Sequence, residues 1–125
     1  MKTINLIGKF SNSWGVEHFY KKAFEQLGYQ VNAIDIQYLS LSGLKSNCLT
    51  IVLQGYGIDP RIIYAGKQIT NRPWVLWHAE VMSQEWPTND PVVEFKARQL
   101  SQNIQAFDAV GHNCYCCLET IKKIG

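Results

Sequence analysis

The stretch I-N-L-I-G-K-F-S-N-S-W-G-V-E-H-F-Y, residues 4–20, decides the fold of this chain of 125 residues. Its apolar start, Ile4–Ile7, predicts a buried strand, and the polar segment between Gly8 and Gly15 predicts a loop. The residues after Gly15 predict an amphipathic helix that ends at Gly28, before a second apolar run. This order places free backbone N–H groups and the positive end of the helix dipole at the loop. We therefore expect binding chemistry there.

The rest of the chain continues to alternate strands and helices. Strands are predicted at 30–36, 48–54 and 74–77, and residues 108–110 lead into a short fifth strand that ends near His112. Two further helices begin at the pairs Asp59-Pro60 and Asp90-Pro91, each an N-cap followed by proline. Residues 37–47 predict a loop or one irregular helical turn. The apolar strand runs are unbroken, which is typical of strands buried on both faces of a parallel sheet. We predict an α/β domain, a three-layer Rossmann-like parallel sheet with helices on both faces.

Helical periodicity also predicts buried faces. The expected apolar positions are, in the first helix, Val16, Phe19, Tyr20, Ala23, Phe24 and Leu27; in the second, Ile62, Ile63, Ala65, Gly66 and Ile69; in the third, Val93, Ala97, Leu100, Ile104 and Phe107; and in a last helix, Cys117, Leu118, Ile121 and Ile124. Ser13 is predicted to cap the first helix, and His18 is predicted to lie on the surface.

Composition narrows the function classes. Hydrophobic residues make up 46% and charged residues 18% of the chain, as in a folded domain. The net charge of +2, with basic residues scattered, argues against nucleic-acid binding. No stretch is long and apolar enough for a transmembrane segment and none resembles a signal peptide, so we expect a cytoplasmic protein. Three of the four cysteines lie within 114–117, a poor zinc-ligand spacing, so we expect no metal site.

The common nucleotide-binding motifs are absent. Neither G-x-G-x-x-G nor G-x-x-x-x-G-K-[ST] occurs, and the expected carboxylates of a phosphoacceptor receiver domain are missing. A flavodoxin-like phosphate loop remains open, because Ser11, Asn12 and Ser13 can donate hydrogen bonds.

Three segments carry a family resemblance. S-W-G-V-E-H-F-Y at 13–20, with L-G-Y-Q-V at 27–31, resembles the opening of GT-B-fold glycosyltransferases, in which G-G-x-E-R-x-x-x starts the first helix. Trp14 replaces the usual first glycine and His18 the usual arginine. R-P-W-V-L-W-H-A-E at 72–80 is similar to the K-P-x-V-x-W-x-x-D segment of bacterial glycosyltransferases related to the spore-maturation CgeB proteins, and F-D-A-V at 107–110 resembles their F-D-x-V segment.

The resemblance implies a role and partners. Residues 1–125 would form one domain, the N-terminal, acceptor-binding half of a two-domain glycosyltransferase that moves a sugar from a nucleotide-sugar to a sugar or glycoconjugate acceptor. The nucleotide-sugar would bind mainly to a C-terminal donor-binding domain outside this chain. No metal or other cofactor is implied, and the isolated chain is expected to be inactive.

Candidate site residues follow from their places at strand ends and in loops. His78 and Glu80 follow a buried strand, where a histidine or carboxylate can deprotonate an acceptor hydroxyl, so both are expected to be catalytic. The expected substrate-binding residues are Ser13, Trp14, Glu17, Tyr56, Trp86, His112 and Asn113. Structural roles remain open: His78 as a partner of the strand end, Glu17 at the helix dipole and Asn113 as a helix cap.

Two other functions remain open. One is a stand-alone, non-catalytic α/β binding module, which an open sheet edge would allow to form a homo-oligomer. The other is a small flavodoxin-like nucleotide-binding domain. A second α/β domain downstream would favour the glycosyltransferase, whereas a bound flavin would favour the flavodoxin-like domain.

Overall fold

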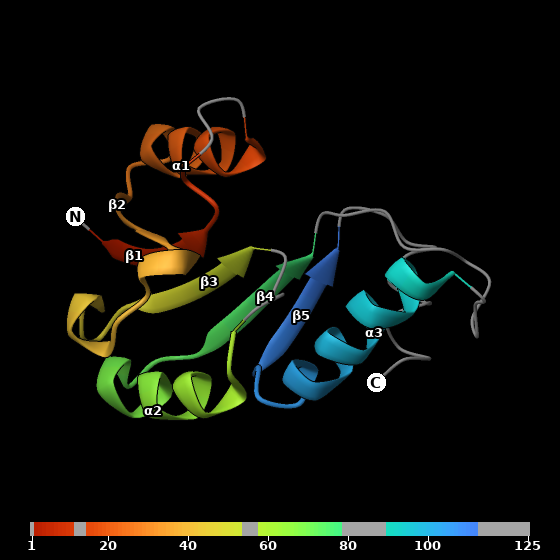
Figure 1. The fold of residues 1–125 in the computed structure, drawn as a ribbon. Coiled ribbons are helices and arrows are strands. Elements are labelled where there is room, and N and C mark those ends of the chain that lie inside the picture. The colour runs from red at the N-terminus through yellow and green to blue at the C-terminus, as the bar shows by residue number, and fades with distance from the viewer. Residues whose placement is uncertain (1, 12–14, 54–57, 79–89, 113–125) are drawn as a thin grey trace.

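The computed structural model describes residues 2–11, 15–53, 58–78 and 90–112 (Figure 1). Five parallel strands form one sheet in the order β2-β1-β3-β4-β5. The strands are β1 (Thr3–Gly8), β2 (Gln30–Asp35), β3 (Leu49–Leu53), β4 (Trp74–His78) and β5 (Ala109–His112). The α-helices of the described part are α1 (Val16–Gln26), α2 (Pro60–Thr70) and α3 (Pro91–Ile104). The predicted α/β class with a parallel sheet is confirmed.

The helices cover both faces of the sheet. Figure 1 shows α1 on one side of the sheet and α2 and α3 on the other. In the inner strand β1 the consecutive residues Leu6 and Ile7 point to opposite faces, and both are fully buried. The unbroken apolar strands are therefore explained by burial on both faces.

The connection from β2 to β3 is irregular, as predicted for 37–47. It consists of two 3₁₀ turns, η1 (Ile36–Tyr38) and η2 (Leu41–Gly43). The side chain of Asn5, fully buried in β1, holds this connection: its Oδ1 accepts from Lys45 N at 3.0 Å and from Asn32 Nδ2 at 2.8 Å. Its Nδ2 donates to Lys45 O at 3.0 Å and to Thr50 Oγ1 at 3.2 Å. One amide thus satisfies the polar groups of a loop that has no regular hydrogen-bond ladder.

Trp74 anchors the layer of α2 beneath the sheet. It is fully buried, and its indole N–H donates to Thr70 Oγ1 at 3.1 Å. Gly66 leaves space for the indole, because a Cβ there would lie 2.3 Å from Trp74 Cζ2. The glycine in the middle of α2 is therefore required by packing rather than by backbone conformation.

Asp108 ties the start of β5 to β4 and α2. Its Oδ2 accepts from Trp74 N at 2.8 Å, and its Oδ1 lies 3.1 Å from Lys67 Nζ. The hydrogen bond from Trp74 N, followed by that from Lys67, lowers the pKa of Asp108 against the opposing effect of desolvation. The aspartate of the F-D-A-V segment thus has a structural role.

The helix ends follow the sequence signals in part. Asp59 Oδ1 accepts from Arg61 N at 2.9 Å as N-cap of α2, and Asn71 ends that helix with φ 50°. Gly28 follows α1 with φ 95°, as a helix-ending glycine should. The N-cap of α1 is Gly15, so the prediction of Ser13 as its cap is wrong.

The predicted buried face of α1 is largely wrong. Val16, Phe19 and Leu27 are 46%, 68% and 73% exposed, and Ala23 is exposed too. The face that meets the sheet carries Glu17, Tyr20 and Phe24, of which Glu17 is only 6% exposed. The helix is rotated by about one residue, roughly 100°, from the expected orientation.

The same offset occurs at the end of α2. Ile69 is 40% exposed, whereas Thr70 is fully buried and bonded to Trp74. In α3 the predicted face is confirmed at Ala97 and Leu100, both buried, and at Phe107 just beyond the helix. The predicted last helix lies outside the described residues.

None of the helices in the described ranges has the length and apolarity needed to cross a membrane.

Candidate functional site

The carboxyl ends of the strands meet at one edge of the parallel sheet. From β1 the chain crosses to β2 on one side, whereas β3, β4 and β5 continue on the other side. The direction of winding therefore reverses between β1 and β3, and ligands of open α/β sheets bind outside the carboxyl ends at such a point. Gly8 and Leu53 end the two strands there.

Two predicted site residues come together at this edge. His78 ends β4 and His112 ends β5, and the two are Cα partners in the register of these neighbouring strands. They are 34 positions apart in the sequence, and the backbone of the parallel pair brings them into adjacent places. The structure thus places the backbones of both residues at one edge of the sheet, and their roles in catalysis and binding remain predictions.

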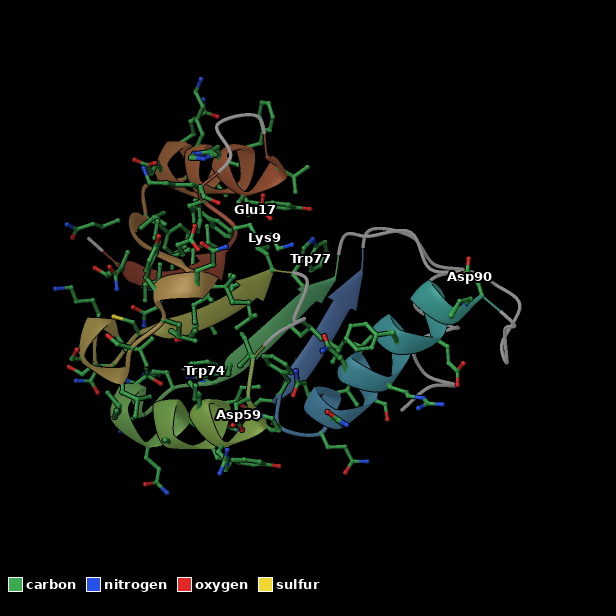
Figure 2. All side chains as sticks on the ribbon, in the orientation of Figure 1. Lys9, Glu17, Asp59, Trp74, Trp77 and Asp90 are labelled. Carbon is green, nitrogen blue, oxygen red and sulfur yellow. The ribbon has the colours of Figure 1, made fainter. Side chains whose placement is uncertain are left out.

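Glu17 lies at the same edge, above the end of β1. Its Cγ would be 2.7 Å from a Cβ at Gly8, and the same point is 3.4 Å from Leu53 Cδ1. Figure 2 shows Glu17 on the side of α1 that faces the sheet, with Lys9 and Trp77 labelled near the tips of the strand arrows. Glu17 is 6% exposed, and within the described residues no donor or cation pairs with its carboxylate.

An aromatic pair adjoins this edge on the face covered by α1. Trp77 Nε1 donates to Tyr20 Oη at 2.8 Å, which joins β4 to α1. Gly111 makes room for the indole, since a Cβ there would be 2.5 Å from Trp77 Cε3. A cavity of about 200 Å³ lies beside them, lined by Tyr20, Phe24, Ile51, Leu53, Val75 and Trp77.

Sequence reasoning did not assign Tyr20 and Trp77 to the site. Tyr20 was expected in the core, and Trp77 in a strand. The available signals were their neighbours: Tyr20 follows Glu17 by three positions, one helical turn, and Trp77 directly precedes His78.

His18 differs from its prediction as a surface residue. It is half-buried, and its Nε2 lies 3.0 Å from Phe10 O, while the two rings meet edge to face with centroids 5.6 Å apart. Its visible role is to fix the backbone that follows β1.

The other predicted site residues lie outside the described residues. These are the expected catalytic Glu80 and the expected substrate-binding Ser13, Trp14, Tyr56, Trp86 and Asn113. Their assignments therefore remain predictions.

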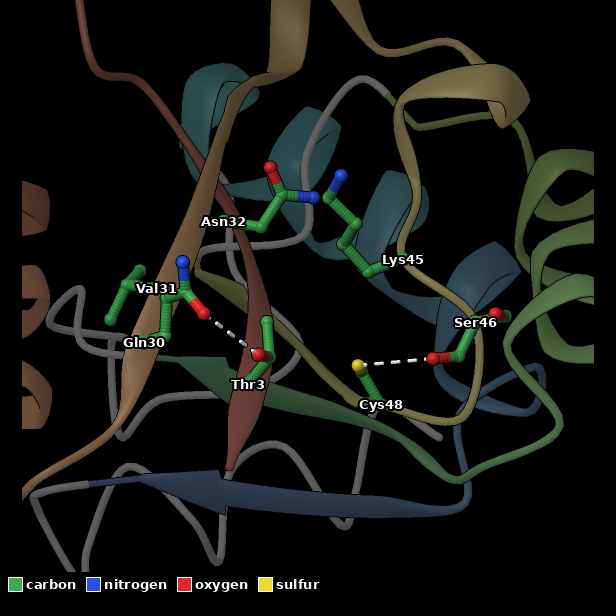
Figure 3. Close-up of a pocket in the computed structure, with 7 residues that line it drawn as sticks. All are labelled: Thr3, Gln30, Val31, Asn32, Lys45, Ser46 and Cys48. Carbon is green, nitrogen blue, oxygen red and sulfur yellow. Dashed lines mark hydrogen bonds between the residues drawn. The ribbon is translucent and has the colours of Figure 1, made fainter. Parts of the chain in front are cut away.

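A second hollow, of about 430 Å³, lies at the opposite edge of the sheet, near the amino ends of β1 and β2 (Figure 3). Its polar side chains bond locally: Thr3 Oγ1 to Gln30 Oε1 at 3.4 Å and Cys48 Sγ to Ser46 O at 3.2 Å. The amino edge is not where open parallel sheets bind ligands, so we place the candidate site at the carboxyl edge.

The described part of the chain offers no metal site. No group of three or more His, Cys, Asp and Glu side chains there is arranged to hold a metal ion.

Comparisons with protein-family models and with curated proteins found no match for this chain.

Proposed function

We propose that this chain is the acceptor-binding domain of a glycosyltransferase. A nucleotide-sugar would be bound mainly by a second, C-terminal domain, and transfer would take place in the cleft between the two. The proposal is supported by the sequence resemblance at 13–20, 72–80 and 107–110 and by the carboxyl-edge position of His78, His112 and Glu17.

The observation that carries the proposal is the pairing of His78 with His112 at the ends of two neighbouring strands. Transfer to a hydroxyl requires a base that takes the hydroxyl proton as the new bond to the sugar forms. A histidine suits this role near neutral pH. We assign the base to His78, with Glu80 as the other candidate, and a role in acceptor binding to His112.

The aromatic pair beside this edge suits the same ligand. Tyr20 and Trp77 present apolar rings with polar tips, and aromatic faces pack well against sugar rings or apolar acceptors. The bond between Trp77 Nε1 and Tyr20 Oη holds both rings in place.

Transfer assays on the two-domain protein test the proposal. His78→Ala should lower kcat by at least about 100-fold, the usual contribution of general base catalysis. His112→Ala should mainly raise KM, and Gln102→Ala, at an exposed position of α3, should change neither. Circular dichroism melting should show all three variants folded.

Three outcomes would contradict the proposal. Transfer by residues 1–125 alone would overturn the division of roles between two domains. Unchanged transfer in both His78→Ala and Glu80→Ala would show that neither residue is the general base. Absence of transfer with every nucleotide-sugar and glycoside tried would contradict the proposed transferase activity.

One observation favours a second candidate, a flavodoxin-like nucleotide-binding domain. The strand order β2-β1-β3-β4-β5 is the order of flavodoxin, in which the flavin phosphate binds at the reversal between β1 and β3. Titration with FMN, followed by quenching of flavin fluorescence, separates the two. Micromolar binding would favour this candidate.

We also propose a cytoplasmic location. Cys48 is a free thiol, as expected in a reducing compartment. Fractionation of the source cells, with thiol labelling of Cys48, tests this point.

A further inference from the structure

Glu17 distinguishes the carboxyl edge of this sheet from an ordinary phosphate site. A helix N-terminus attracts anions through its free N–H groups and its dipole. In this chain the first turn of α1 carries the acidic side chain of Glu17, and its Cγ lies against Gly8 at the end of β1. The negative charge therefore stands where a phosphate would have to bind.

The side chain of Glu17 is almost entirely buried, and its carboxylate has no partner among the described residues. A buried carboxylate is normally held by several hydrogen bonds or by a cation. Glu17 is 6% exposed, and within the described ranges nothing donates to it; Lys9, which follows Gly8, is exposed and forms no ion pair with it. An unpaired carboxylate at the point where the winding of the sheet reverses is suited to accept hydrogen bonds from a ligand.

We propose that Glu17 is a ligand-binding residue that accepts hydrogen bonds from the hydroxyl groups of an uncharged, sugar-like acceptor and excludes phosphate from this edge. The inference rests on the proposed function and adds the substrate class. A carboxylate offers two oxygens to a pair of neighbouring hydroxyls, and such charge-assisted hydrogen bonds are stronger than neutral ones. The described residues provide no further acidic ligands for a metal at this point.

The position of Gly8 supports this assignment. A side chain at residue 8 would collide with Glu17 Cγ and displace the carboxylate. Glycine at the end of β1 is thus required for Glu17 to lie across the sheet edge. Tyr20, one turn further along α1, and Trp77 place aromatic surface on the same side of the sheet.

Binding by the chain of residues 1–125 tests the inference. Amide shifts of Gly8, Glu17 and Leu53 are followed by NMR during titration with a panel of methyl glycosides, with inorganic phosphate and with FMN. We expect at least one glycoside to shift these amides at millimolar concentration, and phosphate and FMN to leave them unchanged.

Glu17→Gln should weaken glycoside binding about tenfold, the loss expected when a hydrogen bond loses its charged acceptor. The same variant should keep the melting temperature within about 2 °C of the unchanged protein, because glutamine has nearly the same shape and the change removes no bond among the described residues. Weaker binding at unchanged stability is not expected of a residue with a purely structural role. The matched control is Glu25→Gln on the exposed side of α1, where Glu25 pairs with Lys21 at 3.0 Å; it should leave binding unchanged.

Several results would overturn the inference: no shift with any glycoside, phosphate or FMN shifting the same amides more strongly than the glycosides, or an unchanged glycoside affinity in Glu17→Gln. These failures are distinct from failure of the proposed function. Glycoside binding that depends on Glu17, without transfer in the two-domain protein, would refute the transferase alone. Transfer that depends on His78, with unchanged KM in Glu17→Gln, would refute this inference alone.

Discussion

At the scale of single residues, the positions that determine packing are small or polar. Asn5, in the centre of the sheet, uses its one amide to bond Lys45, Asn32 and Thr50. Gly66 acts through the absence of a side chain. The space that this leaves allows Trp74 to fill the layer beneath the sheet. Both residues would score poorly as core residues by hydrophobicity.

Gly66→Ala should destabilise the domain by about 2 kcal/mol. Alanine gains about 1 kcal/mol of helix propensity over glycine, but the new methyl would lie 2.3 Å from a buried indole. Overpacking costs about 1–3 kcal/mol, and more where a rigid ring must move, so packing outweighs propensity. Urea unfolding measures the difference.

The matched control for that variant is Gly43→Ala. The nearest neighbour of a Cβ at Gly43 is Ser40 Oγ at 3.7 Å, so the free energy of unfolding should stay within about 0.5 kcal/mol of the unchanged protein. A stabilised Gly66→Ala variant would contradict the packing role given to Trp74.

At the scale of elements, α1 is the helix whose orientation departs most from expectation. Its apolar stripe Val16, Phe19 and Leu27 is exposed, and the side toward the sheet carries Glu17 and Tyr20. Hydrophobic periodicity identifies a helix but assigns its buried side only to within about one residue, because polar groups such as the hydroxyl of Tyr20 also have bonds to make.

Asp108 joins three elements through one carboxylate and gives a pH prediction. Because the pKa of Asp108 is lowered in the fold, its contribution to stability is present above its unfolded pKa of about 3.9 and is lost as pH falls through the folded value. In Asp108→Asn, the deficit in the free energy of unfolding should be largest near pH 6 and should shrink below about pH 4.

Carbon-13 NMR titration of the Asp108 carboxyl checks the cause. The midpoint should lie below the usual aspartate pKa, and Lys67→Met should raise it only in part, because the bond from Trp74 N remains. A midpoint at or above the usual value would contradict the assignment.

At the scale of the whole molecule, the protection of backbone amides from hydrogen exchange should follow the order of the strands in the sheet. Strands β1 and β3 lie inside the sheet and contain the fully buried Leu6, Ile7 and Val52, whereas β2 and β5 are the outer strands of the described sheet. Hydrogen exchange should therefore be slowest in β1 and β3 and faster in β2, β5 and α1, where much of the helix surface is exposed. Exchange in α1 as slow as in β1 would show that its exposed stripe is covered in solution.

The sequence by itself determined the order and type of the described elements. Unbroken apolar runs, the Asp59-Pro60 signal and the glycine after α1 depend on local chemistry, which neighbouring residues supply, so they predict the alternation and the parallel sheet. The placement of His78 at a strand end also follows from the chain alone.

Only the tertiary structure decided which residues from distant parts of the sequence lie next to one another. The register sets His78 beside His112, the rotation of α1 buries Glu17 over Gly8, and Tyr20 meets Trp77 across 57 positions of sequence. These contacts depend on how a helix rolls on a sheet and how strands align, which is fixed by packing between distant segments rather than by any local pattern.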